Sequence, residues 1–461
     1  HISSEINGEV FLKLENLQYT SSFKVRGAYT SIIRLKEEKK KMGVIAMSAG
    51  NHAQAVAWWA KKERVNATIV MPEHAPLFKV MKTKSLGADV ILRGRTLNES
   101  QTYVSELVKD KKLTLIHPYD DSNVVIGQGT LGLEFMEDIK DLDLLVIPIG
   151  GGGLISGVSI VAKALNPNIK IYGVQTEKFP SMYNVLHKKE LAILGDTLAD
   201  GIAVKRPGKI TSEIIKDHVD DILLINEFEL EKAISSLFEN ERVVAEGAGA
   251  AGVAAIMNNK DKFSGKKVGT VICGGNIDSR IFAEILNKQL SRDGKLARIR
   301  IGITDEPGML AKISNAIAKN GGNIIEIYHQ RMFHDVPIKK AKIDAVIEAQ
   351  NKKSIEEIIS TLKSEGFEVT SNSYFDIEAD YDIGKVDQNY LYNVLSKIDL
   401  NGAEALFVSC TALPVLQIIQ KLEKNLKKFV LSSNQVLIWD TLEKIGQNNS
   451  ISGFGKLFNS N

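Results

Sequence analysis

Short apolar segments alternate with helical patterns along about the first 285 residues of this 461-residue chain. Segments 43–49, 66–72 and 144–149 have the composition of buried strands, and each precedes a stretch with the apolar spacing of a helix. This alternation predicts an α/β fold with a mostly parallel sheet covered by helices. Since ligands of such sheets bind beyond the carboxyl ends of the strands, we expect the functional residues to follow strands.

Two further parts follow this segment. From Ala297 the pattern is strand, helix, two strands, helix and strand over about 70 residues, which is the order of a ferredoxin-like domain. The rest of the chain has the pattern of an αβαβα fragment of about 90 residues, which is short for an α/β domain standing alone. We therefore expect three parts, at 1–290, 297–369 and 370–461.

The composition favours a globular protein with a large core. Hydrophobic residues make up 44% and charged residues 25% of the chain, and a net charge of +2 gives no strong attraction to nucleic acid or anionic lipid. No segment reaches the roughly 20 apolar residues of a transmembrane helix. Cys273 and Cys410 fall in different predicted parts, so we expect no disulfide and a cytoplasmic location. Residue 1 is His rather than Met, and we expect the native chain to start earlier.

One lysine stands in unusual surroundings. In the stretch SSFKVRGAY, Lys24 lies between Phe23 and Val25 and follows two serines. A lysine that forms a Schiff base benefits from such neighbours, because its amine, with an ordinary pKa of about 10.4, must be partly desolvated to act as a nucleophile near neutral pH. An exposed lysine in a strand-to-helix turn fits the same nine residues, so this stretch alone leaves both interpretations open.

The loop Ser48-Ala49-Gly50-Asn51-His52 is suited to a carboxylate. It lies between a predicted strand and a predicted helix, so its backbone N–H groups and the helix N-terminus can hold an anion. An ordinary helix cap would use the same residues. We expect His52 to be a packing or helix-start residue rather than a catalyst.

The run Gly150-Gly151-Gly152-Gly153-Leu154 is suited to a phosphate. Four consecutive glycines cost backbone entropy and contribute nothing to packing, which is understandable where the backbone must approach a phosphate closely. A flexible loop is the alternative, but the position at a strand end makes it the weaker one. The run lacks the lysine and hydroxyl of a nucleoside-triphosphate loop, so ATP does not fit.

Two further stretches carry candidate groups. Glu246 opens a run of small residues at 246–250, where it is either a helix-start acid or a group near a cofactor ring. Cys273 ends the predicted strand KVGTVIC and precedes Gly274-Gly275-Asn276. A thiol in that position is often part of the core, and it could also face a ring nitrogen as a weak donor.

A nucleophilic lysine, a phosphate loop and a carboxylate loop on one α/β sheet imply pyridoxal phosphate acting on an amino acid. The set resembles the serine/threonine ammonia-lyases (threonine dehydratases), which have the tryptophan-synthase-β-like fold, fold type II. The resemblance covers residues 1 to about 285 and rests on FLKLENLQ, SSFKVRGAY, SAGNHAQ, MPEHAP, GQGTLGLE, PIGGGGLISG, LADGIAV, VAEGAGA and CGGNID. The segment 297–369, with TDEPGML and NIIEIYH, resembles an ACT domain.

The resemblance implies roles for individual residues. Lys24 would form the Schiff base with the cofactor and, once freed, would take the α-proton of the substrate. Asn51 would bond the phenolic oxygen of the ring, and Cys273 would face the pyridine nitrogen as a neutral partner. The other implied cofactor contacts are Phe23, Gly150, Gly151, Gly152, Gly153, Leu154 and Glu246, and the implied carboxylate loop is Ser48, Ala49, Gly50, Asn51 and His52.

The implied reaction is elimination of the β-hydroxyl of threonine, and of serine as well, to give a 2-oxo acid and ammonia. The alternatives are a dehydratase for 3-hydroxyaspartate or a hydroxyectoine-derived substrate, a serine racemase, a β-replacement enzyme similar to cysteine synthase, and a pseudoenzyme that only binds the cofactor. Racemase relatives carry a cation site made of a glutamate and an aspartate six residues later. Here the residue six positions after Glu177 is Tyr183 rather than an aspartate, so we expect no metal there.

The ACT resemblance implies a regulatory ligand. We expect a small molecule, an amino acid in particular, at the turn formed by Asp305, Pro307 and Gly308, and we expect a homo-oligomer.

The tail resembles a different superfamily. AEALFVSCTALP and LSSNQVLIW are similar to the second half of the aspartate/glutamate racemase superfamily, most closely maleate isomerases and arylmalonate decarboxylases. Those enzymes use one cysteine from each of two halves. Cys410 matches the second cysteine, while the first half is absent. We therefore expect a gene fusion or an assembly artefact joined near 366–370, and a tail without racemase activity.

Overall fold

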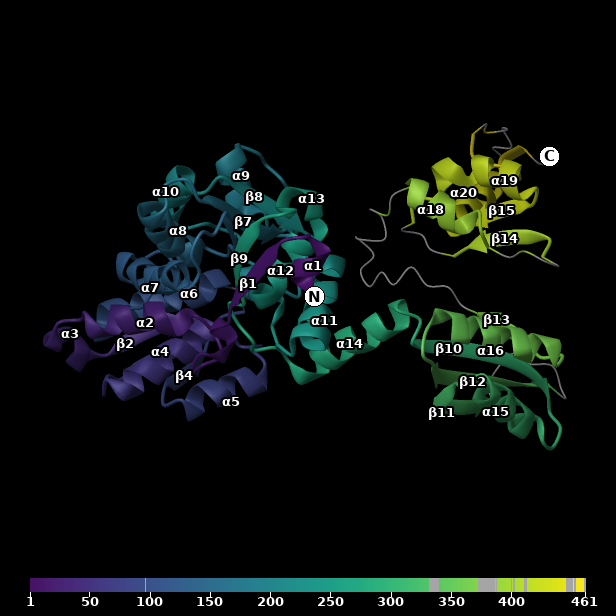
Figure 1. Ribbon diagram of the computed structural model, residues 1–461, viewed down its shortest axis with the longest axis horizontal. Coiled ribbons are helices and arrows are strands. Elements are labelled where there is room, and N and C mark those ends of the chain that lie inside the picture. Colours follow the sequence, from purple (N-terminus) through teal and green to yellow (C-terminus); the bar gives the residue numbers. More distant parts are fainter. Residues whose placement is uncertain are drawn as a thin grey trace. The chain divides into compact units, whose positions relative to one another are not determined.

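The computed structural model describes residues 1–95, 97–330, 340–371, 386, 388–398, 400, 403–409, 413–444, 451 and 453–459. The chain divides into two compact units, and the first contains residues 1–297 together with segments 315–323 and 347–360. Figure 1 shows the helices and strands in chain order. No helix in the described ranges is long and apolar enough to cross a bilayer.

Five parallel strands form the larger sheet of the first unit. Their order is β1 (Glu9–Lys13), β9 (Lys267–Val271), β6 (Leu144–Pro148), β7 (Lys170–Thr176) and β8 (Asp221–Ile225). All neighbouring strands pair in parallel, and β1 from the start of the chain lies against β9, with Glu9 opposite Lys267. The carboxyl ends of β1, β6 and β9 therefore meet at one edge. The predicted parallel sheet is confirmed.

A second parallel sheet forms a smaller lobe. Its order is β4 (Asp89–Leu92), β3 (Ala67–Met71), β2 (Val44–Met47) and β5 (Thr114–Leu115). The helices α4 (Asn51–Lys62) and α5 (Leu77–Ser85) follow β2 and β3. Strand periodicity predicts parallel strands but not their partners, and this is why the sequence analysis expected one sheet where the structure has two.

The remaining helices of this part alternate with the strands. Side-chain caps define several of their starts: Asp121 accepts from two backbone N–H groups of α7, Asp278 does the same at α14, and Asn226 forms a reciprocal capping box with Glu229 at α11. The helices are α1 (Ile2–Glu5), α2 (Lys24–Ile33), α3 (Glu37–Met42), α6 (Leu97–Lys111), α7 (Ser122–Asp138), α8 (Gly153–Leu165), α9 (Ser181–His187), α10 (Lys209–His218), α11 (Glu227–Glu241), α12 (Gly247–Asn258), α13 (Lys260–Phe263) and α14 (Ser279–Arg292), with short 3₁₀ turns η1 (Glu15–Leu17) and η2 (Asp200–Ile202).

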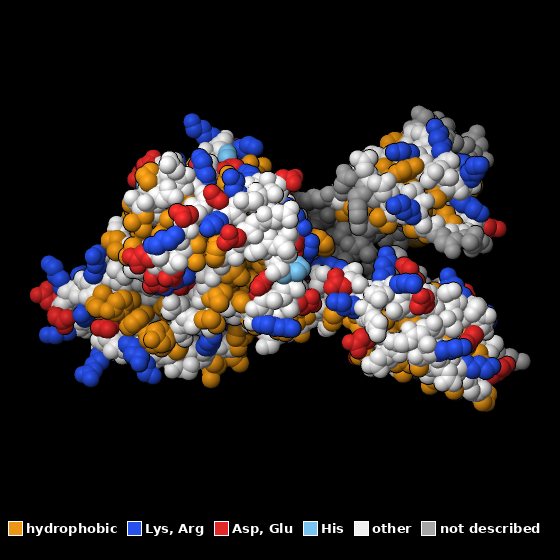
Figure 2. Space-filling model, in the orientation of Figure 1, with side chains coloured by type: hydrophobic (Ala, Val, Ile, Leu, Met, Phe, Trp, Pro, Cys, Tyr) orange, Lys and Arg blue, Asp and Glu red, His pale blue; other side chains and the backbone are white. Residues whose placement is uncertain are grey.

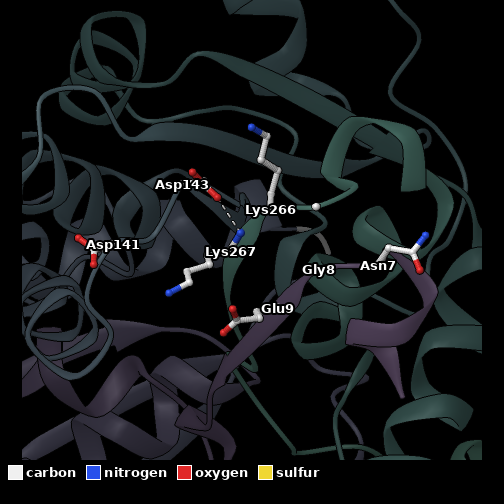
Figure 3. Close-up of a pocket in the computed structure, with 8 residues that line it drawn as sticks. Asn7, Gly8, Glu9, Asp141, Asp143, Lys266 and Lys267 are labelled. Atoms are coloured by element: carbon white, nitrogen blue, oxygen red, sulfur yellow. Dashed lines mark hydrogen bonds between the residues drawn. The ribbon is translucent and has the colours of Figure 1, made fainter.

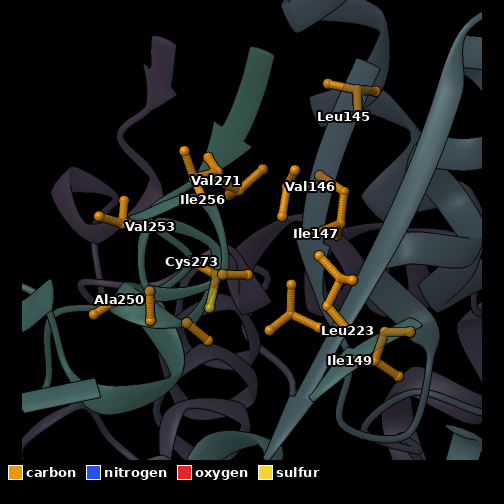
Figure 4. Close-up of a cluster of buried hydrophobic side chains, with 14 of the residues drawn as sticks. Leu145, Val146, Ile147, Ile149, Leu223, Ala250, Val253, Ile256, Val271 and Cys273 are labelled. Atoms are coloured by element: carbon orange, nitrogen blue, oxygen red, sulfur yellow. The ribbon is translucent and has the colours of Figure 1, made fainter. Parts of the chain in front are cut away.

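The two sheets have separate hydrophobic cores. The larger core packs β6 and its neighbours against α12, with Cys273 beside Ala250 and Val253 (Figure 4). The smaller core contains Val25 and Ile32 of α2 together with the inner faces of β2, β3 and α4. The two cores share no residue, so each sheet has a core of its own, and helix α7 packs against both α2 and α8.

The visible surface carries charges of both signs. Figure 2 shows Lys and Arg side chains interspersed with Asp and Glu, which agrees with the net charge of +2. Apolar side chains gather where Figure 1 places α2 and α4. Helix α5 exposes Leu77, Phe78 and Met81.

Residues 296–371 form a four-stranded sheet with two helices. The sheet order is β11 (Asn323–Gln330), β12 (Lys340–Glu348), β10 (Leu296–Thr304) and β13 (Glu368–Ser371). Helix α15 (Met309–Lys319) follows β10 and α16 (Lys352–Ser364) follows β12, so the chain order is βαββαβ. Every second residue is buried from Ile299 to Ile303 in β10 and from Ala341 to Ile347 in β12, which is the pattern of a sheet with one covered face. Asp344 is buried as well, where it pairs with Arg298 and Arg300. The predicted ferredoxin-like order is confirmed.

The described part of the tail contains two parallel strands, β14 (Ala405–Val408) and β15 (Phe429–Ser432). They alternate with α18 (Gln388–Leu395), η3 (Leu416–Ile418), α19 (Ile419–Leu426), α20 (Ser433–Lys444) and η4 (Leu457–Asn459). Leu391, Val415, Ile419 and Leu422 are buried in one small core. The predicted αβαβα pattern is confirmed in this part, while Cys410 lies outside the described residues.

Candidate active site

Lys24 is held beside the end of β9. The backbone N–H of Phe23 donates to the carbonyl of Cys273 at 3.1 Å, and the N–H of Gly275 donates to the carbonyl of Ser21 at 2.9 Å. These two bonds fasten the segment before α2 to the segment after β9. Lys24 is the first residue of α2, so its side chain starts from this fastened turn.

The amine of Lys24 lies among protein groups. Its Nζ donates to the carbonyl of Pro118 at 2.8 Å and stands 5.1 Å from the centre of the Phe23 ring. Burial lowers the pKa of Lys24 from 10.5 to about 8, against the opposing effect of Cys273 and Glu246. A larger fraction of this amine is therefore neutral near pH 7 than of an exposed lysine. These are the surroundings of a nucleophilic lysine rather than of a solvated turn.

The loop 48–52 follows β2 and begins α4. The N–H of Ser48 donates to the carbonyl of Val70, and the Oγ of Ser48 accepts from the N–H of Gly50, both at 3.1 Å. No described atom lies within 4 Å of where a Cβ of Gly50 would be, so the loop faces open space. Ala49 packs at the edge of the smaller core.

His52 is a buried packing residue. Its Nε2 bonds the carbonyl of Ile116 at 2.8 Å, and burial lowers the pKa of His52 to about 3. The imidazole is therefore neutral at physiological pH and unsuited to donating a proton. This position agrees with the expectation that His52 is not a catalyst.

The glycine run lies between β6 and α8 and forms a cradle. Gly152 has φ of +98°, a left-handed conformation that suits glycine, and Gly153 begins α8. The carbonyl of Gly151 accepts from the Oγ1 of Thr211 at 2.6 Å, so the cradle is anchored from one side. Across the described residues, no protein acceptor takes the N–H groups of Gly151, Gly152 or Gly153. Leu154 turns into the larger core.

The segment His117-Pro118-Tyr119-Asp120 completes the surroundings of the cradle. The Tyr119 ring lies so close to Gly151 that a Cβ there would overlap it. The Asp120 carboxylate accepts from the N–H groups of Lys209 at 3.0 Å and Ile210 at 2.9 Å, which holds the start of α10 beside the cradle. Sequence analysis missed this segment, although its position after β5 was a usable signal.

A buried network joins Asn51 to Glu246. The Nδ2 of Asn51 donates to the Glu246 carboxylate at 2.6 Å, and the Nδ2 of Asn276 donates to the Oδ1 of Asn51, also at 2.6 Å. Glu246 is the N-cap residue of α12 and is only 5% exposed. Burial, with a smaller contribution from Asp200, raises the pKa of Glu246 from 4.5 to about 7. Sequence analysis named Asn276 within a motif but gave it no role.

Cys273 is buried behind Lys24. Its Sγ donates to the carbonyl of Ala248 at 3.2 Å, and burial raises the pKa of its thiol. Cys273 is therefore a neutral thiol at physiological pH.

The turn predicted to bind a regulatory ligand lies between β10 and α15. Asp305, Pro307 and Gly308 are all exposed, and Gly308 has φ of +89°. The position thus leaves room for a small molecule at the start of α15.

A further pocket lies at the amino-terminal ends of the strands of the larger sheet. It is lined by Asn7, Gly8, Glu9, Asp141, Asp143, Gly265, Lys266 and Lys267, where β1 and β9 begin (Figure 3). One Asp143 oxygen accepts from the backbone N–H of Lys267 at 2.8 Å. Since Lys24 and the cradle follow the carboxyl ends of the strands, this pocket is separate from the site.

Three families match the chain, and the segments of two of them overlap over residues 336–367. Residues 297–367 match the ACT domain and residues 336–458 match arylmalonate decarboxylase. Residues 1–274, more than half of the chain, match the pyridoxal-phosphate dependent enzymes. The chain belongs to this family. The resemblances stated from sequence are confirmed for all three parts.

Individual pyridoxal-phosphate dependent enzymes are similar over long segments. The L-threonine ammonia-lyase of Thermotoga maritima is 47% identical over 370 residues, which is 80% of this chain and 92% of that protein. Among solved structures, threonine deaminase isoform 2 from Solanum lycopersicum has 35% identity and a TM-score of 0.59, covering 62% of this chain and 84% of that one. Serine racemase from Dictyostelium discoideum has 38% identity and a TM-score of 0.57, covering 60% and 90%.

The site fits the family's cofactor on its own features. A phosphate needs donors, and the cradle offers N–H groups at the start of the 13-residue helix α8. An aldehyde needs a primary amine that is partly neutral, and Lys24 provides one. A pyridine ring nitrogen can be faced by an uncharged group, and the buried Cys273 thiol is one. The residues present are therefore suited to pyridoxal phosphate.

Proposed function

We propose that this chain is a threonine ammonia-lyase that uses pyridoxal phosphate to convert threonine, and serine as well, to a 2-oxo acid and ammonia. The observation that carries the proposal is the amine of Lys24, enclosed beside Pro118 in a pyridoxal-phosphate enzyme fold. The threonine ammonia-lyase of Thermotoga maritima supports the choice of substrate.

Each part of the site has a role in binding. The N–H groups of Gly151–Gly153 hold the phosphate, and Asn51 keeps one amide hydrogen for the ring oxygen because its other one is used by Glu246. The open loop at 48–51 binds the carboxylate of the amino acid, which fixes the α-carbon near Lys24.

The chemistry is a proton transfer followed by loss of the hydroxyl. Bound pyridoxal phosphate supplies a conjugated ring that accepts the electron pair of the α-carbon. The neutral amine of Lys24 takes the α-proton, and the Cβ–O bond breaks as the hydroxyl leaves with a proton as water. Later addition of one water releases ammonia, so threonine gives 2-oxobutanoate and ammonia with no net change in water.

The decisive variant is Lys24→Ala. It should abolish ammonia release from threonine. It should also abolish the visible absorbance of the Schiff base between the lysine and the bound cofactor. Lys36→Ala, an exposed lysine at the start of α3, is the matched control and should keep both. Ammonia release at the wild-type rate by Lys24→Ala would refute the proposal.

A substrate panel separates the alternatives. Threonine, serine, 3-hydroxyaspartate and a hydroxyectoine-derived amino acid are compared by 2-oxo acid release, and D-serine is measured with L-serine as substrate. We expect the largest kcat/KM with threonine. Dominant D-serine formation would favour the racemase alternative, to which the similarity with the Dictyostelium discoideum enzyme points.

The regulatory ligand is a separate part of the proposal. We propose that an amino acid binds at the exposed turn of Asp305, Pro307 and Gly308 and that the protein is a homo-oligomer. Calorimetry of the full chain with the common amino acids tests the first point, with Asp305→Ala as the variant that should weaken binding. Sedimentation at several concentrations tests the second. A ligand regulates the enzyme only through different affinities for two states, so activity should be measured alongside.

A further inference from the structure

We propose that Lys82 and Asn276 are positioning residues that set the orientation of the Asn51 side-chain amide through a one-way chain of hydrogen bonds. They thereby fix the direction of the amide hydrogen that Asn51 keeps for the cofactor. The inference rests on the proposed function, because the orientation of Asn51 matters for the reaction only when the cofactor ring lies beside it.

The chain of hydrogen bonds has three short links. Lys82 Nζ donates to Asn276 Oδ1, Asn276 Nδ2 donates to Asn51 Oδ1, and Asn51 Nδ2 donates to a Glu246 oxygen, each at 2.6 Å. Asn276 is fixed further by a second donation, from Nδ2 to the carbonyl of Thr20 at 2.8 Å. Every link lies well within hydrogen-bonding distance.

The lysine end determines the direction of the whole chain. A lysine ammonium can only donate. Lys82 therefore requires the oxygen of Asn276, which leaves the nitrogen of Asn276 to face Asn51. Asn51 must therefore accept with its side-chain oxygen, and its side-chain nitrogen then points toward Glu246. Reversing either amide alone would place two donors or two acceptors face to face, and the Thr20 carbonyl, which only accepts, requires the same orientation of Asn276. Glu246 accepts from Asn51 in this orientation whether it is ionised or protonated.

The chain also connects the two lobes. Lys82 lies on α5 in the smaller lobe, whereas Asn276 and Glu246 belong to the larger lobe. Because the lobes have separate cores, this contact depends on how closely they approach. A second lysine of α5, Lys79, also crosses between the lobes, to Asp200 at 2.8 Å. It acts on the amide chain only as a smaller electrostatic contribution to the pKa of Glu246, and no described hydrogen bond joins it to the two asparagines. It therefore provides a natural comparison.

The test uses the full-length holoenzyme and four variants. Lys82→Met removes the donor, Lys82→Arg restores one, and Asn276→Asp replaces the amide that both accepts and donates with a carboxylate of equal size that only accepts. Lys79→Met breaks the other lobe contact. The measurements are the visible absorbance maximum of the bound cofactor, cofactor affinity by titration of the cofactor-free enzyme, and kcat and KM with threonine.

The proposal predicts a graded pattern. Lys82→Met should shift the absorbance maximum and lower kcat by about two- to tenfold with KM within about twofold, and Asn276→Asp should lower kcat and cofactor affinity by at least about tenfold. Lys82→Arg should recover most of the wild-type values, and Lys79→Met should leave the absorbance maximum in place. Equal effects of Lys79→Met and Lys82→Met, or an unchanged absorbance in Asn276→Asp, would overturn the proposal. Absence of ammonia release in the wild-type enzyme would instead count against the proposed function, while absorbance and affinity would still decide this inference.

Discussion

The side-chain amide of Asn51 donates to the carboxylate of Glu246 over 2.6 Å, at a point where Glu246 is almost entirely buried. Hydrogen bonds from the Asn51 amide and the Asn276 backbone do not offset the cost of burying a charge. Burial and the nearby Asp200 raise the pKa of Glu246 to about 7, while Asn51 and Lys79 act in the opposite direction. Glu246 therefore titrates near neutrality in the folded protein and near its ordinary value of 4.5 when unfolded.

This difference makes stability depend on pH. Between pH 4.5 and about 7 the folded state binds more protons than the unfolded state, so the stabilisation from protonated Glu246 is complete below pH 4.5 and is lost as pH rises through 7. Glu246→Gln removes this dependence. We measure the free energy of unfolding of both cofactor-free proteins in urea at pH 4.5 and at pH 8. Over this interval, the free energy of unfolding of the variant should rise by about 3 kcal/mol relative to that of the wild type. If the free energy of unfolding of the two proteins changes with pH in the same way, Glu246 does not titrate in this range.

The cradle gives a prediction about backbone conformation and space together. Gly152 has φ of +98°, and a Cβ there would come within 2.8 Å of the Thr211 Cβ. Gly152→Ala should therefore lower the affinity for pyridoxal phosphate by about tenfold or more, because the cradle must shift. Gly195→Ala is the matched control, since Gly195 has φ of +87° in an exposed loop with only the flexible Lys178 side chain nearby. Both variants carry backbone strain, and only the first should weaken cofactor binding in a titration. Equal affinities would refute the phosphate role of the cradle.

Arg26 gives a prediction about stability. Its guanidinium bonds both oxygens of Glu15 at 2.8 Å and both oxygens of Glu134 at 2.7 Å, and Glu15 is only 2% exposed. Arg26→Met leaves the Glu15 carboxylate buried without its partner and should cost about 3 kcal/mol or more in unfolding free energy. Adding Glu15→Gln should recover a large part of this loss. Arg280→Met breaks an exposed pair with Glu284 and should cost less than about 1 kcal/mol. An equal loss of unfolding free energy in both arginine variants would show that the buried ion pair contributes no more to stability than the exposed one.

The sequence predicted the elements of this fold better than their arrangement. Periodicity located β2, β3 and β6 because buried parallel strands are continuous apolar runs. It could not show that β2 and β6 belong to different sheets, since partner choice depends on contacts far apart along the chain. The pairing of β1 with β9 is such a contact.

The candidate site divides in the same way. Lys24 and the glycine run were found because each is chemically unusual within a few residues. Asn276 and Lys82 were not, because a lysine on an amphipathic helix and an asparagine in a turn are common, and their meaning comes only from the hydrogen bond between them. Tyr119 likewise became relevant only when it was seen against Gly151.

The tail gives the last prediction. It holds the two parallel strands β14 and β15, and Cys410 follows β14 in sequence, outside the described residues. Proton transfer in the superfamily that the tail resembles needs two bases on opposite faces of the substrate, and one thiol can supply only one. The other cysteine, Cys273, is buried in the pyridoxal-phosphate part with its thiol on the Ala248 carbonyl. The purified chain should therefore not interconvert the enantiomers of aspartate or glutamate, and Cys410→Ser should leave ammonia release from threonine unchanged. Racemisation of aspartate that disappears in Cys410→Ser would show that the tail is active after all, with its second base supplied by another copy of the chain.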